Sequence, residues 1–160
     1  MDLLAYEGPD GELTLRPSFT AVAAFFDLGP DYWHGGSGSA YIGWIKLRDP
    51  GYSLLTERPI LHIVVHEPYG VSLSYQVMSY QAGAANFALM TYNDMAADDL
   101  LVEHYIGGEP AYFPHRSFVS RDAAERVIAR FLETQETPTE GAWRPRREVT
   151  YDGYGYRDQG

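Results

Sequence analysis

The sequence contains no cysteine among its 160 residues. This absence excludes a disulfide framework, a thiolate metal site and a cysteine nucleophile. No run of about 18 apolar residues is present, so no transmembrane helix is predicted. Residues 1–9 contain neither a basic stretch nor a long apolar segment, which argues against a secretory signal peptide. We therefore expect a soluble cytoplasmic protein.

Basic residues are scarce: 12 stand against 22 acidic residues, which gives a net charge of −10. The excess is uneven, because residues 1–109 hold 14 acidic and 4 basic side chains whereas residues 110–160 hold 8 of each. Such a surface repels phosphates, so direct binding to nucleic acid is not expected. A basic macromolecular partner is compatible with this charge, and solubility alone is the simpler explanation.

Apolar residues make up 45% of the chain and aromatic residues 14%, which is typical of a folded protein. The length fits one domain, predicted over residues 1–150. The glycine-rich segment 151–160 is expected to be a flexible C-terminal tail.

Alternating and β-branched segments predict a series of short strands, and two segments have helical spacing. Ser120 is a suitable N-cap for the clearer helix. We predict an α+β fold, a single domain with a mostly antiparallel sheet packed by two main helices. The predicted helices are 18–28 and 120–134, the predicted loop is 31–40, and the predicted strands are 12–16, 41–47, 60–66, 71–77, 87–92, 100–106 and 143–149.

Catalytic motifs are missing from the sequence. The segment Gly35–Ser39 fits neither the hydrolase nucleophile elbow nor a phosphate-binding loop, and a flexible loop is expected there. His62 and His66 share a face of one predicted strand, but the strand rise places them about 13 Å apart, too far for one metal ion. Glu103 and His104 are neighbours on a strand and point to opposite faces. No catalytic residue, metal site or cofactor is predicted, and the protein is not expected to be an enzyme.

An acidic stretch between residues 94 and 103 does not have the spacing of a calcium-binding EF-hand loop. It is either a solvated loop or an anionic patch that contacts basic side chains of a partner. Tyrosines near turns are further contact candidates, because tyrosine is enriched in protein interfaces. The candidate partner-binding residues are Asp94, Asp98, Asp99, Glu103, Glu109, Tyr69, Tyr92, Tyr105 and Tyr112.

The segment from Leu100 to Trp143 has a characteristic order. A strand leads to the Gly107-Gly108 turn with an acidic residue after it, then to Phe113-Pro114, an alanine-rich helix, Phe-Leu, a proline and a tryptophan. This series resembles immunity protein family one of bacterial polymorphic toxin systems. The loop at 35–39 and the tail at 150–160 look longer than the core of that family.

The resemblance implies a non-enzymatic antidote that binds a cognate secreted toxin, often a nucleic-acid deaminase, and occludes its active-site groove. The partner would be a basic toxin domain bound 1:1, without direct contact to nucleic acid or membrane. Two other functions stay open. One is an acidic adaptor or nucleic-acid mimic with a basic non-toxin partner. The other is a small enzyme or ligand-binding domain that uses His104, Glu103 or His62.

Overall fold

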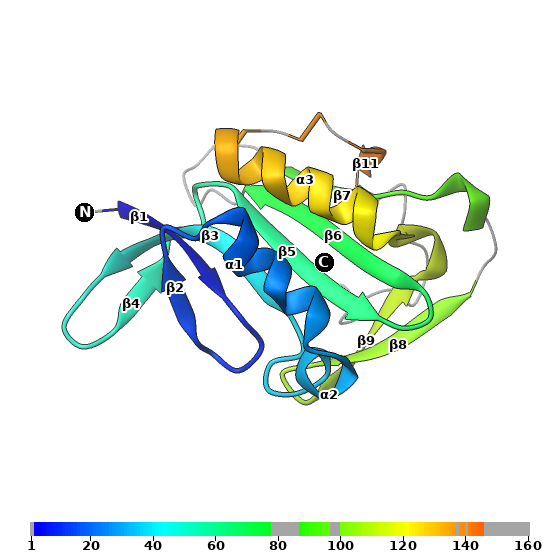
Figure 1. Cartoon of the computed structure of the whole chain (residues 1–160), viewed down its shortest axis with the longest axis horizontal. Coiled ribbons are helices and arrows are strands. Elements are labelled where there is room, and N and C mark those ends of the chain that lie inside the picture. The colour runs from blue at the N-terminus through cyan, green and yellow to red at the C-terminus, as the bar shows by residue number, and fades with distance from the viewer. Residues whose placement is uncertain (1, 78–86, 97–99, 137, 140, 146–160) are drawn as a thin grey trace.

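The sheet is the centre of the fold (Figure 1). The computed structural model describes residues 2–77, 87–96, 100–136, 138–139 and 141–145. Within these residues, nine strands form one antiparallel sheet with the order β11-β7-β6-β5-β3-β1-β2, while β10 pairs with β6 and β4 pairs with β3. The strands of this sheet are β1 (Asp2–Glu7), β2 (Leu13–Leu15), β3 (Ala40–Leu47), β4 (Tyr52–Leu54), β5 (Ile60–His66), β6 (Gly70–Val77), β7 (Phe87–Thr91), β10 (Phe118–Val119) and β11 (Trp143–Pro145).

Helices cover one face of the sheet, where α1 and α3 cross in front of β5 and β6 in Figure 1. Ser120 caps α3 by accepting a hydrogen bond from the backbone of Ala123 at 3.2 Å. The apolar stripe of α3 is buried, and the ring of Phe131 lies 6.3 Å from that of Tyr75 on β6. The helical segments are α1 (Phe19–Ala23), η1 (Ala24–Asp27), α2 (Pro30–Trp33), η2 (Asp94–Ala96), η3 (His115–Ser117) and α3 (Arg121–Thr134).

A separate hairpin of β8 (Leu101–Ile106) and β9 (Glu109–Pro114) packs on the opposite face of the sheet. Val64 of β5 and Met90 of β7 contact its inner residues, Val102 and Phe113, in a second apolar cluster. Successive strand residues alternate between faces, so the same strands that bury one set of residues under the helices bury the other set under the hairpin. The hairpin is therefore held by a core of its own.

Hydrogen bonds from buried hydroxyls hold η3, the segment that follows the hairpin, against the sheet. Ser72 and Ser117 are hydrogen-bonded at 2.9 Å, although both are almost fully buried. The hydroxyl of Thr91 accepts from the backbone of Leu73 at 3.0 Å and lies 2.8 Å from the carbonyl oxygen of Ser117. Buried polar atoms need such partners, because each one left without a hydrogen bond costs free energy.

The predicted α+β class is confirmed, and the predicted strand 60–66 matches β5. The predicted helix 18–28 is divided into α1 and the 3-10 segment η1, and Gly29, with a φ of 90°, separates it from α2, which begins at Pro30. The prediction of a loop over 31–40 is wrong for residues 31–33, which belong to α2. Strands β1, β4, β9 and β10 were not predicted.

Residues 146–149 and the tail 151–160 lie outside the described part of the chain. Among the described helices, none is long and apolar enough to cross a membrane.

Candidate functional site

The outer side of the β8–β9 hairpin brings together three of the predicted contact residues. Glu103 lies opposite Tyr112, and Tyr105 lies opposite Pro110, so all four side chains share one face. We call these four residues the hairpin face. Tyr105 is 52% exposed, and Glu103 is also exposed. Neighbouring His104 and Ala111 are buried on the inner side, which fixes the orientation of the hairpin face.

Glu103 and Tyr105 interact on this face. A hydrogen bond to the Glu103 side chain, followed by the charge of that carboxylate, raises the pKa of the Tyr105 hydroxyl. The phenol is protonated at neutral pH and donates this hydrogen bond to the carboxylate. The face thus combines a negative charge with two amphipathic rings.

The other predicted acidic residues lie elsewhere. Glu109 is exposed, but it lies opposite Ile106 and therefore belongs to the other side of the hairpin, near its turn. Asp94 is exposed at the start of η2, beside Met95, which is 90% exposed. Asp98 and Asp99 lie outside the described residues. The predicted acidic patch is therefore only partly described.

Tyr69 and Tyr92 are half-buried and pack against the second apolar cluster. The ring of Tyr69 lies 5.9 Å from that of Phe118 and 5.0 Å from that of His115. The guanidinium of Arg144 lies 4.6 Å from the ring centre of Tyr92. These contacts give both tyrosines a packing role at the edge of the core, so they offer less free surface than Tyr105.

Three histidines converge beside the hairpin: His34 after α2, His66 at the end of β5 and His104 on β8. One ring nitrogen from each lies within 4.8 Å of the other two. The Nδ1 atoms of His66 and His104 are 3.0 Å apart, and Nε2 of His104 lies 2.6 Å from the carbonyl oxygen of Gly38. We call these three residues the histidine cluster.

The hydrogen bonds fix the proton positions of two rings. A carbonyl oxygen only accepts, so Nε2 of His104 carries a proton and Nδ1 of a neutral His104 ring has a free lone pair. Nδ1 of His66 then donates to it. Burial, helped by the neighbouring histidines, lowers the pKa of His66 to about 4, and burial also lowers the pKa of His104. Both rings are neutral at pH 7.

Two backbone hydrogen bonds hold the loop at 35–39. The backbone of Ser37 donates to the carbonyl of Pro9 at 2.8 Å and accepts from the backbone of Gly107 at 2.9 Å. Gly38 has a φ of 78°, and a Cβ there would overlap the carbonyl oxygen of Tyr105. The predicted flexible loop is instead a connector between the β1–β2 turn and the hairpin.

The histidine cluster was missed by sequence reasoning, which considered His62 with His66 and His104 with Glu103. His62 contacts the ring of Tyr41 at 6.2 Å instead. The three histidines lie far apart along the chain, and the packing of α2 and of the hairpin against β5 brings them together. No local sequence spacing carries that signal.

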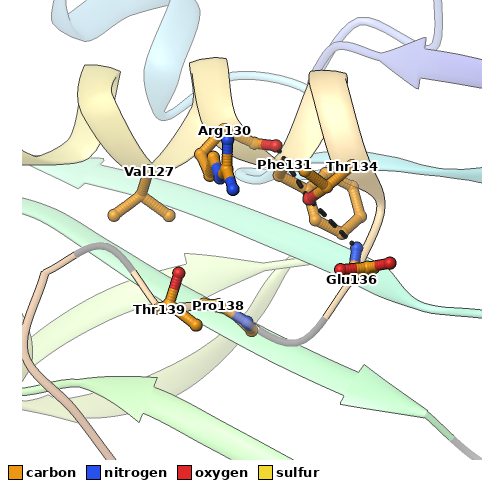
Figure 2. Close-up of a pocket in the computed structure, with 7 residues that line it drawn as sticks. All are labelled: Val127, Arg130, Phe131, Thr134, Glu136, Pro138 and Thr139. Atoms are coloured by element: carbon orange, nitrogen blue, oxygen red, sulfur yellow. Dashed lines mark hydrogen bonds between the residues drawn. The ribbon is translucent and has the colours of Figure 1, made fainter.

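A pocket lies between the C-terminal half of α3 and the segment that follows it (Figure 2). It holds about 80 Å³, whereas small-molecule sites usually measure roughly 300–1,000 Å³. Thr134 spans part of its wall by hydrogen bonds with the backbone of Arg130 and Glu136. The pocket has the size of a site for a few water molecules and carries no functional argument.

A family model described as "Immunity protein Imm1" matches residues 31–145, which is more than half of the chain. The matched region contains the hairpin face, the histidine cluster, the loop at 35–39 and α3. Neither a curated protein nor a solved structure matches the chain.

Proposed function

This chain belongs to the Imm1 family of immunity proteins, and from this premise we propose that it neutralises one cognate secreted toxin by binding the toxin domain 1:1. The proposed toxin is a nucleic-acid deaminase, and the proposed place of action is the cytoplasm of the producing cell. Deaminase domains hold their polynucleotide in a groove around a zinc-activated water. Covering that groove stops the reaction without any catalytic step in the antidote.

Charge supports this partner class. A groove that binds phosphates is basic, and the net charge of −10 on this chain attracts it. Complementary charge raises association rates and penalises wrong partners. An antidote benefits from fast association, because the toxin acts as soon as it is free.

The observation that carries the proposed contact surface is the hairpin face. Glu103 lies opposite Tyr112 and two residues before Tyr105 on the same face, so one carboxylate has two tyrosines as neighbours on a two-stranded hairpin. Tyrosine side chains bury large areas at low entropic cost and are frequent energetic centres of interfaces. We place the centre of the toxin contact on this surface.

Survival during co-expression tests the proposal. Cells that express the toxin domain encoded next to this chain should die, and wild-type chain should rescue them. The double variant Glu103→Lys with Tyr105→Ala should lose the rescue, because it reverses the central charge and removes the most exposed ring. Glu57→Lys is the matched control, since Glu57 is exposed away from the hairpin and changes the net charge equally.

Three outcomes would contradict the proposal. Death of cells that express both the toxin domain and wild-type chain would show that this chain does not neutralise that toxin. Full rescue by the double variant would remove the hairpin face from the contact. Equal binding of wild-type chain to unrelated basic proteins would favour the acidic adaptor instead.

A further inference from the structure

We propose that His34, His66 and His104 form a zinc site in which each residue supplies one ring nitrogen. The site would have three protein ligands and an open fourth position for water. Neutral imidazole is among the preferred ligands of zinc. This site is independent of the proposed toxin contact.

The spacing of the nitrogens fits a common ion. Tetrahedral zinc with Zn–N bonds of 2.0–2.1 Å holds its ligand nitrogens about 3.3 Å apart. The Nδ1 atoms of His66 and His104 lie 3.0 Å apart, close to that value. The full set spans up to 4.8 Å, so one ring must approach by about 1 Å or more. His34 is the exposed member of the set and follows a helix of four residues, so it has room for this shift.

The buried ligand already has the support that metal-binding histidines receive. Such a ring usually donates its second N–H to a carboxylate or a backbone carbonyl, which selects the tautomer and the ring orientation. His104 does this with the carbonyl oxygen of Gly38, so its Nδ1 lone pair points toward His66. Gly38 reaches this position only because it lacks a Cβ that would overlap Tyr105. The loop at 35–39 thus supplies the carbonyl oxygen that accepts the second N–H of a fully buried imidazole.

The environment also favours neutral ligands. Phe113 packs against His104, with ring centres 6.0 Å apart, and Tyr69 packs against His66 at 6.1 Å. These rings shield the nitrogens from water on one side. A divalent ion would replace the hydrogen bond between His66 and His104 with direct bonds to the ring nitrogens, and the His66 proton would then lie on Nε2 of that ring.

A bound ion would connect three separate segments. It would join the end of α2, the end of β5 and strand β8, and it would thereby fix the hairpin to the sheet. The inner side of the hairpin carries the ligand, and the outer side carries the hairpin face. Zinc would therefore stabilise the fold around that surface without touching it.

The first test is a titration of the full-length chain, without a histidine tag and after treatment with a chelator, with zinc chloride. We expect one ion per chain. At free zinc of 100 times the dissociation constant, the melting temperature should rise by about 5–10 °C. His34→Ala should weaken zinc binding by more than about 100-fold, since even outer partners of metal ligands contribute 10–100-fold. It should leave the melting temperature of the metal-free chain almost unchanged, because His34 is exposed.

Two further variants separate coordination from general effects. His62→Gln is the matched control, because His62 lies on the same strand as His66 with the same half-buried environment. It should bind zinc like wild type. His34→Cys should restore binding, since thiolate is also a zinc ligand. With cobalt in place of zinc, the same variant should gain a sulfur-to-cobalt charge-transfer absorption, which the cysteine-free wild type lacks.

The proposal is overturned by a wild-type chain that binds no zinc. It is also overturned if His34→Ala binds zinc as tightly as wild type, or if cobalt-loaded His34→Cys shows no charge-transfer band. In each of these cases the cluster is a hydrogen-bonded group of neutral histidines that stabilises the fold alone.

Discussion

Substitution of Gly38 by alanine should destabilise the fold far more than a similar substitution in an open turn. Alanine at a φ of 78° costs about 1–2 kcal/mol, because its Cβ disfavours the left-handed region. The new Cβ would also overlap the carbonyl oxygen of Tyr105, so the loop must move away. That movement breaks the hydrogen bond to buried His104, and an unsatisfied buried group costs about 1–3 kcal/mol.

The expected total for Gly38→Ala is about 2–5 kcal/mol, which lowers the melting temperature of a domain of this size by roughly 5–15 °C. Gly11→Ala is the matched control, because Gly11 has a φ of 83° and no atom within 4 Å of the added Cβ. Gly11→Ala should lower the free energy of unfolding only by the cost of placing alanine in the left-handed region, about 1–2 kcal/mol. Urea unfolding with a chelator present gives both values. Equal destabilisation of the two variants would refute the reasoning.

Three further substitutions test the core and the capping groups. Phe25→Ala removes a ring that is 2% exposed and should cost about 3–5 kcal/mol in urea unfolding, whereas Phe19→Ala, at 38% exposure, should cost far less; similar values would contradict the assigned core. Ser120→Ala removes the N-cap of α3 and should lower the free energy of unfolding by about 1 kcal/mol, whereas Ser120→Thr keeps a capping hydroxyl and should retain most of that stability. Thr91→Val keeps the shape but leaves the backbone N–H of Leu73 without its partner; we expect a loss of about 1–3 kcal/mol, and a neutral effect would show that this buried hydroxyl is not needed.

Local sequence patterns predicted the elements that depend mainly on residues close together in the chain. The β-branched run at 60–66 predicted β5 with its bounds, and the capped, amphipathic segment from Ser120 predicted α3 to within one residue at its start. Strand β9 was missed, because Gly107 and Gly108 make the turn and the chain re-enters a strand at Glu109, which has a proline after it. Strand β1 was missed because its pairing with β3 is non-local and its short sequence lacks clear alternation.

The candidate site was predictable only in part, for a geometric reason. Alternation along β8 correctly separated Glu103 from His104, and the face of Glu103 and Tyr105 follows from the same rule. The position of Tyr112 beside them depends on the register with β9, which sequence alone did not provide. The histidine cluster depends on the packing of the hairpin against β5 and on the path of the loop at 35–39. Both are tertiary features without a local sequence pattern.

The most direct test of the central claim is a binding titration between this chain and the purified toxin domain encoded beside it, with the activity of the toxin measured in the same samples. We predict a 1:1 complex with a nanomolar or lower dissociation constant, and loss of toxin activity in proportion to the complex formed. We also predict that association slows as salt is raised, because the attraction between the acidic chain and a basic groove is screened. Toxin that stays fully active at a saturating concentration of this chain would contradict the account.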